Sequence, residues 1–139
     1  MLEILNLIIT WFLVGLIWVI QVVHYPAFRF FDDKNFLSFH HFHTKSITKI
    51  VGPTMLAELG LGLGLVVTNG GQYDFLVPFI LVLAIWGSTV LIQIPLHSKL
   101  GDKFDRDNVE KLISSNRIRT FLWSLKGLWV AYFFYLKVF

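Results

Sequence analysis

The hydrophobic residues of this chain fall into four long runs separated by polar segments. The runs cover about residues 4–24, 46–68, 74–96 and 118–138. A helix needs about 20 apolar residues to cross the hydrocarbon layer of a membrane. Backbone that faces lipid must also satisfy its own hydrogen bonds, which a helix does. The pattern therefore predicts four transmembrane helices in a single domain over residues 1–139.

The segments between the runs predict how the helices are connected. Asn69-Gly70-Gly71-Gln72 is short and turn-like, so the second and third helices should form a hairpin. Asp32 and Asp33 can cap a helix that starts early, near Lys34, which predicts an amphipathic extension before the second span. Longer loops are expected at 25–45 and 97–117. The predicted fold is an all-α, antiparallel four-helix membrane bundle.

Composition agrees with a membrane protein and excludes several classes of chemistry. Hydrophobic residues make up 55% of the chain and charged residues only 15%, whereas soluble domains carry about 25% charged residues. The chain has no cysteine, so it has no disulfide and no thiolate site. No phosphate-binding loop, dinucleotide fingerprint or Ser-His-Asp signature is present.

The basic residues predict the orientation of the helices in the membrane. All Lys and Arg residues except Lys126 and Lys137 lie in or beside the segments after the first and third runs. Short cytoplasmic loops retain positive charge, so both segments should be cytoplasmic and both termini should lie on the opposite side. We expect a bacterial inner-membrane protein whose main partner is the lipid bilayer. A protein partner or a second copy stays open, and nucleic acid is not expected.

Each run carries a stripe of polar or aromatic residues at helical spacing. Residues three and four apart share one face of a helix, so each stripe can point into the bundle. Inward-facing stripes predict a polar, aromatic-lined cavity that opens toward the cytoplasm. The stripes are Thr10, Ile17, Gln21 and His24; His40, His43, Ile47, Thr54 and Glu58; Trp86, Thr89, Gln93 and His97; and Asn116, Arg119, Trp123 and Lys126.

Four histidines at the cytoplasmic ends of these stripes form the candidate site. Neutral imidazole binds haem iron and transition-metal ions. We expect His24, His40, His43 and His97 to converge on one pocket, with Asn116 and Arg119 at its rim and Trp123 as a wall. Haem is the first cofactor expected, with Lys45, Lys49, Arg117 and Arg119 as cations for its propionates. A metal ion is the alternative cofactor, and ordinary interfacial histidines are the structural alternative.

Two charged residues fall inside the apolar runs. Glu58 lies about twelve residues into the second run and Lys126 about eight into the fourth. An unpaired charge at such depth costs at least about 2.5–3.5 kcal/mol. Because the two depths match when measured from the same membrane face, we expect Glu58 and Lys126 to form a buried ion pair, with a structural role favoured over a catalytic one.

Short motifs resemble those of a known group of membrane proteins. Trp11-Phe12-Leu13-Val14-Gly15-Leu16, His24-Tyr25-Pro26 and Ile50-Val51-Gly52-Pro53-Thr54-Met55 are similar to the layout of HemJ-type protoporphyrinogen oxidases and their CopD-like relatives. The resemblance implies association with haem. Val19-Ile20-Gln21 stands where the oxidase pattern has a basic residue, so haem binding is implied more than porphyrinogen oxidation.

A second resemblance is to uncharacterised bacterial four-helix membrane proteins. They share the order of a His-Tyr-Pro, a His-x-x-His, a Glu in the second helix, a Pro-x-His and an Asn-x-x-Arg. These are His24 to Pro26, His40 to His43, Glu58, Pro95 to His97 and Asn116 to Arg119. This resemblance implies a shared site without naming its reaction.

Two hypotheses for function follow from the sequence. The first is a haem- or metal-binding membrane protein that acts as an oxidoreductase on a lipophilic substrate, such as a porphyrin or a quinone, at the cytoplasmic face. The second is a non-enzymatic accessory subunit or a small transporter of a membrane complex.

Overall fold

Helices make up nearly the whole chain, and the structure has no strand. The computed structural model describes residues 1–139. Its elements, in chain order, are α1 (Leu2–Val19), the π-helical turn η1 (Ile20–His24), α2 (Tyr25–Ala27), the 3₁₀ turn η2 (Phe28–Phe30), α3 (Asp33–Thr68), α4 (Tyr73–Ser88), the π-helical turn η3 (Thr89–Gln93), α5 (Ile94–Asp102) and α6 (Arg106–Val138).

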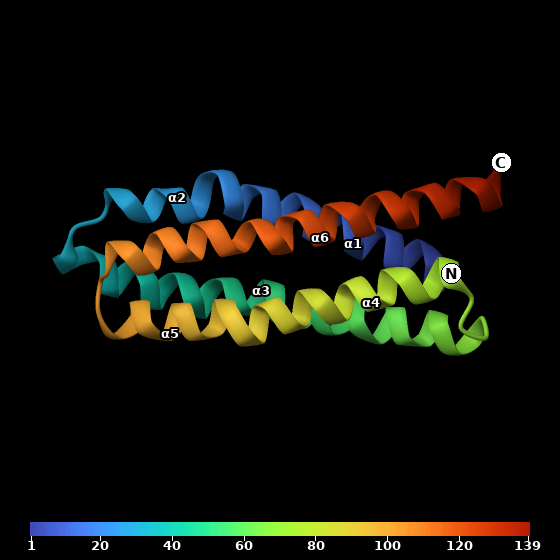
Figure 1. The fold of residues 1–139 in the computed structure, drawn as a ribbon, viewed down its shortest axis with the longest axis horizontal. Helices are drawn as coiled ribbons and strands as arrows, with labels where there is room; N and C mark the ends of the chain where they lie inside the picture. Colours follow the sequence, from blue (N-terminus) through green and yellow to red (C-terminus); the bar gives the residue numbers. More distant parts are fainter.

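These elements form four long segments that lie lengthwise beside one another (Figure 1). The segments are α1 to η2, α3, α4 to α5, and α6. The first and third segments each pack against both α3 and α6. Both termini lie at one end, and the connections α2–α3 and α5–α6 lie at the other (Figure 1). The predicted all-helical architecture of four segments is confirmed.

The segments predicted as long loops, 25–45 and 97–117, are mostly helical, and the predicted early start of the second helix near Lys34 is confirmed. The first segment continues to Phe30 and α3 begins at Asp33, while α5 ends at Asp102 and α6 begins at Arg106. Aspartate N-caps make these short connections possible. Asp32 accepts a hydrogen bond from the Asn35 backbone N–H at 2.9 Å, and Asp105 accepts one from the Asp107 backbone N–H at 2.8 Å. Each cap satisfies a backbone donor that the first helical turn leaves free.

Three of the four segments are long and apolar enough to cross a membrane. They are Leu2–Phe30, Asp33–Thr68 and Tyr73–Asp102. The predicted fourth span at 118–138 lies inside α6, which does not meet the same criterion. The reason is its composition, because Lys126, Lys137 and several Trp and Tyr residues interrupt its apolar residues.

Two π-helical turns interrupt the first and third segments, and the sequence analysis did not predict them. The Tyr25 N–H bonds to the Ile20 carbonyl and the Ile94 N–H bonds to the Thr89 carbonyl, five residues back in each case. Proline follows each turn, at Pro26 and Pro95. Because proline has no N–H to continue the ordinary ladder, the preceding turn widens. A π turn rotates the residues that follow it around the helix axis.

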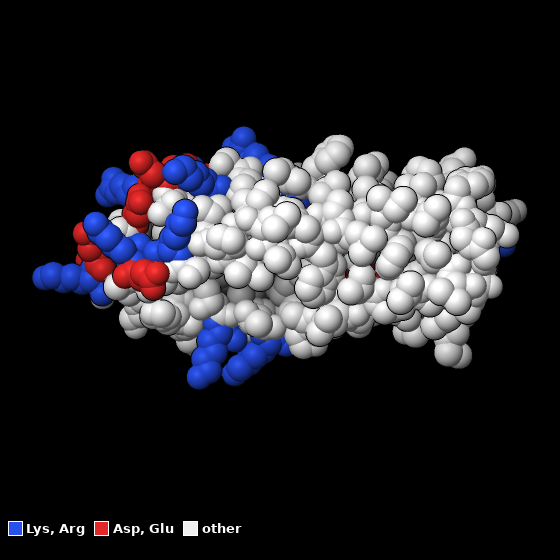
Figure 2. Space-filling model, turned by 60° about the horizontal axis from the view of Figure 1, so that its bottom comes forward, with Lys and Arg blue, Asp and Glu red and all other residues white.

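Charged side chains are concentrated at one end of the molecule. Figure 2 shows Lys, Arg, Asp and Glu gathered at the end that carries the connections α2–α3 and α5–α6, whereas the rest of this face is almost free of charge. Large hydrophobic side chains are exposed along the length of all four segments, including Trp18, Leu63, Leu91 and Leu128. An exposed apolar surface this extensive is typical of a protein that contacts lipid.

The turn predicted at Asn69-Gly70-Gly71-Gln72 connects α3 to α4, and its conformation requires glycine. Gly70 and Gly71 have φ of 63° and 71°, and the Gly71 N–H closes the end of α3 by bonding to the Val66 carbonyl at 2.9 Å. This left-handed conformation costs a residue with a Cβ about 1–2 kcal/mol, which is why glycine occupies both positions.

We expect Gly71→Ala to lower the free energy of unfolding by about 1–2 kcal/mol through backbone strain alone, because a Cβ there meets no atom within 4 Å. Gly64→Ala is the matched control, since Gly64 lies in regular α3 and its Cβ would also meet nothing. The control should be neutral or stabilising. Chemical unfolding of both variants in mixed micelles measures the difference, and equal effects would contradict the assignment of the turn.

Candidate functional site

The four histidines of the predicted site lie together, and they form two hydrogen-bonded pairs. His24 Nε2 lies 2.7 Å from His43 Nδ1, and His40 Nε2 lies 3.0 Å from His97 Nδ1. The rings of His43 and His97, one from each pair, have centroids 5.8 Å apart. The structure therefore brings all four side chains to one place, from η1, α3 and α5.

The four imidazoles are arranged in pairs and not around a common point. No group of three or more His, Asp or Glu side chains is placed to hold a metal ion. The physical reason is the pairing itself, because the nitrogens of each pair face one another instead of a common point. The expectation that His24, His40, His43 and His97 ligate one ion stays a prediction.

Tyr25 is a member of the cluster that the sequence analysis did not select. Its hydroxyl lies 2.9 Å from His97 Nε2, and its side chain is buried. Tyr25, His97 and His40 thus form a continuous hydrogen-bonded chain. The signal in the sequence was its position between His24 and Pro26, but only the widened turn η1 shows that both His24 and Tyr25 face the other segments.

A cavity of about 590 Å³ lies beside the hydrogen-bonded side chains of Tyr25, His97 and His40, between α3 and the segment η3–α5. Tyr25, His40, His97 and Arg119 are among the residues that line it. Its apolar walls include Ile47, Val51, Met55, Trp86 and Ile94. This volume falls within the usual range for small-molecule sites, about 300–1,000 Å³. We call it the lateral cavity.

Several predicted site residues do not line the lateral cavity. His24 and His43 belong to the cluster without lining it, and Asn116 and Trp123 are buried elsewhere. Asn116 instead supports Arg119, whose Nη1 donates to Asn116 Oδ1 at 3.3 Å. The Asn116 amide in turn donates to Gln21 Oε1 at 3.0 Å. Of the expected rim and wall residues, Arg119 alone lines this cavity.

Buried polar atoms without a hydrogen-bond partner concentrate around the lateral cavity. They belong to six residues, and four of these line the cavity: His40 (Nδ1), Trp86 (Nε1), Gln93 (Oε1) and Arg119 (Nε). Leaving a buried polar atom unpaired costs about 1–3 kcal/mol. A concentration of such atoms around one cavity is the pattern expected of a site that binds a polar group.

Glu58 and Lys126 form a fully buried ion pair near the middle of the segments. Lys126 Nζ lies 2.6 Å from Glu58 Oε1, and the two side chains are 1% and 0% exposed. The ammonium has three donors, and it also contacts Thr10 Oγ1 at 2.6 Å and Asn6 Oδ1 at 3.4 Å. Trp123 Nε1 donates to Glu58 Oε2 at 3.1 Å. Every donor of Lys126 therefore has an acceptor, which compensates for burial of its charge.

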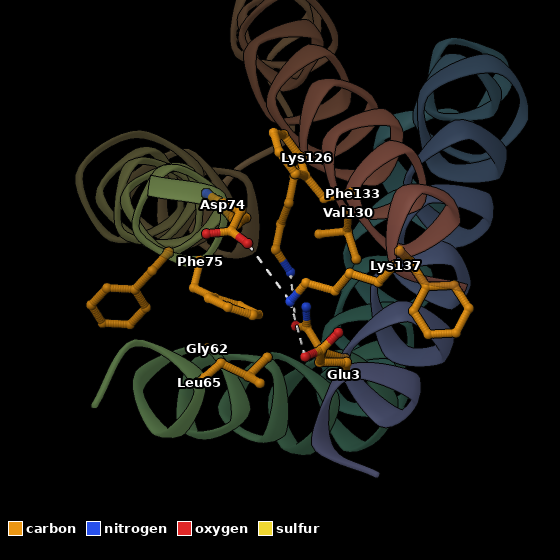
Figure 3. Close-up of a pocket in the computed structure, with 13 residues that line it drawn as sticks. Glu3, Gly62, Leu65, Asp74, Phe75, Lys126, Val130, Phe133 and Lys137 are labelled. Atoms are coloured by element: carbon orange, nitrogen blue, oxygen red, sulfur yellow. Dashed lines mark hydrogen bonds and ion pairs between the residues drawn. The ribbon is translucent and has the colours of Figure 1, made fainter. Parts of the chain in front are cut away.

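A smaller cavity of about 30 Å³ lies on the other side of this pair, toward the termini. Figure 3 shows Lys126 pointing toward it and Lys137 lying between Glu3 and Asp74 at its mouth. Lys137 Nζ is 3.2 Å from Glu3 Oε1 and 3.6 Å from Asp74 Oδ2. This space is enough for one or two water molecules. None of the histidines lines it, so it is separate from the lateral cavity.

An exposed ion pair lies at the opposite end of the molecule. Arg29 Nε lies 2.6 Å from Glu110 Oε1, and Arg29 Nη2 lies 2.6 Å from Glu110 Oε2. This bidentate contact joins η2 to α6. The hydrogen bonds from Arg29 lower the pKa of the Glu110 carboxyl below its ordinary value.

Comparisons with known proteins give no relatives. No family model, no curated protein and no solved structure matches the chain. The resemblances drawn from the short motifs therefore stay predictions, and function has to be argued from the geometry.

We expect Glu58→Gln and Lys126→Met each to lower the free energy of unfolding by about 3–5 kcal/mol, because each leaves one charge buried without its partner. The double variant should recover part of the loss, which gives a coupling energy in a double-mutant cycle. The free energy of unfolding is measured in mixed micelles for the wild type, the two single variants and the double variant.

The half-exposed pair Glu3 and Lys137 provides the matched control. Glu3→Gln and Lys137→Met should couple by less than about 1 kcal/mol, because water screens an exposed pair. If the effects at Glu58 and Lys126 simply add, the buried pair does not stabilise the fold.

Proposed function

We propose that the four segments form an antiparallel bundle that crosses the membrane four times. The main support is the orientation of α6. Its charged residues Arg119 and Lys126 are buried against the other segments, whereas Phe121, Leu125, Leu128, Tyr132 and Leu136 are exposed. Two of the residues that lower the mean hydropathy of α6 most, Arg119 and Lys126, are thus ones that lipid would not meet. Its outer face is as apolar as a membrane span requires.

The bundle has its termini outside the cytoplasm in this proposal. The charged end seen in Figure 2 carries the connections α2–α3 and α5–α6, and the positive-inside rule assigns that end to the cytoplasm. The histidine cluster and the lateral cavity then lie in the cytoplasmic half of the bundle. For a bacterial protein this membrane is the inner membrane.

Reporter fusions test this topology. A C-terminal alkaline phosphatase fusion is expected to be active and a C-terminal green fluorescent protein fusion dark, because both reporters would be translocated. Fusions after Lys103, in the short α5–α6 connection, should give the opposite pattern and serve as the internal control. A C-terminal fusion that fluoresces without phosphatase activity would overturn the orientation.

We further propose that the lateral cavity binds a flat, lipophilic redox compound, with haem as the first candidate. The observation that carries this proposal is the unpaired Nδ1 of His40, a residue that lines the cavity. Porphyrin supplies four of the iron ligands itself, so haem needs only one or two protein ligands. The absence of a three-residue metal group therefore does not count against haem.

The surroundings of His40 fit the role of an axial ligand. A ligating histidine usually has its second ring nitrogen held by a hydrogen bond, which fixes the ring. His40 Nε2 is held in this way by His97, which is itself held by Tyr25. Arg119 is available as a cation for a carboxylate, and the walls are apolar and aromatic. Bound haem would supply one-electron chemistry, while the chain supplies the ligand and excludes water.

A quinone is a second candidate, and one observation favours it. Lys45, Lys49 and Arg117, which were expected to pair with haem propionates, do not line the cavity. A ring compound without carboxylates requires no such cations. Quinone carbonyls instead require a hydrogen-bond donor at the site.

The hydrogen-bonded series Tyr25, His97 and His40 can bind either ligand, because each histidine can carry its ring hydrogen on either nitrogen. If Tyr25 donates to His97, then His97 donates to His40, and Nδ1 of His40 carries a hydrogen that a carbonyl can accept. In the reverse arrangement, Nδ1 presents an electron pair that can bind iron. The same hydrogen bonds hold the ring in both cases.

An absorption spectrum and a quinone extraction of the purified protein test the proposal together. A haem Soret band that is lost in His40→Ala supports haem, and extractable quinone lost in His40→Ala supports the second candidate. Gly101→Leu provides a variant that keeps the imidazole. A Cβ on Gly101 would lie 3.8 Å from His40 Nδ1, so a larger side chain there should cover this nitrogen and reduce binding.

His43→Ala is the matched control. It removes a buried histidine that also has an unpaired nitrogen but does not line the cavity, so it should lower stability while the ligand is kept. Loss of the ligand in His43→Ala and not in His40→Ala would contradict the assignment. Protein free of haem and quinone when purified from cofactor-replete membranes would overturn the proposal in both forms.

A further inference from the structure

A second surface groove, of about 510 Å³, lies between the segment η3–α5 and α6. It is separate from the lateral cavity, because no residue lines both. Lys99 and Lys111 line it together with Ser114 and Ser115, and Leu91, Ile92, Pro95 and Leu96 form the rest. Nothing in the proposed redox site uses these residues.

The lining of this groove changes from charged to apolar along the bundle. Leu91 precedes Lys99 by two helical turns, which corresponds to about 12 Å along the axis. Lys99 and Lys111 lie near the charged end of the molecule, within two turns of the α5–α6 connection. Leu91 is 76% exposed on the apolar side. Charge thus lies toward the membrane surface and apolar side chains toward the membrane interior.

The two lysines have no partners within the chain. Neither forms an ion pair with a carboxylate, although both side chains are exposed on the same groove. Two ammonium groups beside one concave surface repel each other, and an anion between them removes this repulsion. The groove therefore has charge complementarity to an anion with an apolar extension.

We infer that this groove binds an anionic phospholipid, with its headgroup phosphate beside Lys99 and Lys111 and an acyl chain along Leu91 and Ile92. Basic pockets between helices on the cytoplasmic side are suited to such headgroups. Ser114 and Ser115 donate their hydroxyl hydrogens to the Lys111 carbonyl at 3.2 and 2.6 Å, so the two ammonium groups are the donors left for the phosphate. The inference rests on the membrane insertion proposed above, but not on the ligand of the lateral cavity.

Native mass spectrometry of the detergent-purified protein with added lipid tests this inference. Phosphatidylglycerol should bind at least about tenfold more tightly than phosphatidylcholine. Lys99→Gln/Lys111→Gln should weaken phosphatidylglycerol binding about thirtyfold, because each of the two lysines near an anionic lipid contributes about 1 kcal/mol. Lys34→Gln/Lys103→Gln is the matched control. It makes the same change in net charge outside the groove and should retain the wild-type affinity.

Three results would overturn the inference. The first is an equal loss in both double variants, which would indicate general attraction to the charged end. The second is equal binding of the two lipids by the wild type. The third is displacement of phosphatidylglycerol by equimolar inorganic phosphate, which would show that the acyl chain contributes nothing.

Two further readouts separate this inference from the proposals above. The absorption spectrum and quinone content should be unchanged in Lys99→Gln/Lys111→Gln, so a failure at the groove is distinguishable from a failure at the lateral cavity. The reporter fusions test membrane insertion without using any lipid affinity. Both lysines are exposed, so the double variant should also keep the wild-type unfolding curve.

Discussion

The buried pair of Glu58 and Lys126 is the constraint on which the arrangement of the segments depends. A charge inside an apolar bundle is tolerated only when each of its polar atoms has a partner. Lys126 on α6 meets this condition by contacting Asn6 and Thr10 of α1 together with Glu58 of α3. The pair thus fixes how α6 is rotated and how far it is shifted along its axis. The apolar residues of α6 then face outward.

Fixing α6 in this way also places the lateral cavity. Trp123 and Arg119 lie one and two turns from Lys126 on the same face, and Trp123 bonds to Glu58 while Arg119 lines the cavity. The residues around the π turns complete the site from the other segments, because Tyr25 contacts His97 and His97 contacts His40. The ion pair and the histidine cluster therefore belong to one continuous row of inward residues, with the ion pair at its centre and the histidines toward the end that carries the connections α2–α3 and α5–α6.

Much of the site could be predicted because it follows simple helical spacing. The stripes identified His40, Arg119 and Lys126 as inward-facing, and all three are buried. The pairing of His24 with His43 and of His40 with His97 could not be predicted in this way. Which rings meet depends on the rotation that η1 and η3 introduce, and a constant period of 3.6 residues cannot show it. For the same reason Tyr25 was missed.

The sequence by itself determined the helical class, the four segments, the glycine turn, the charge asymmetry between the two ends and the need for a partner to each buried charge. These properties are local or additive, since they depend on the residue type and its place in a run. Only the tertiary structure decided the short connections, the two histidine pairs, the position of the lateral cavity and the separate groove between η3–α5 and α6. Each of these depends on the relative rotation and register of two segments that are far apart in the chain, and no single stretch of sequence encodes that relation.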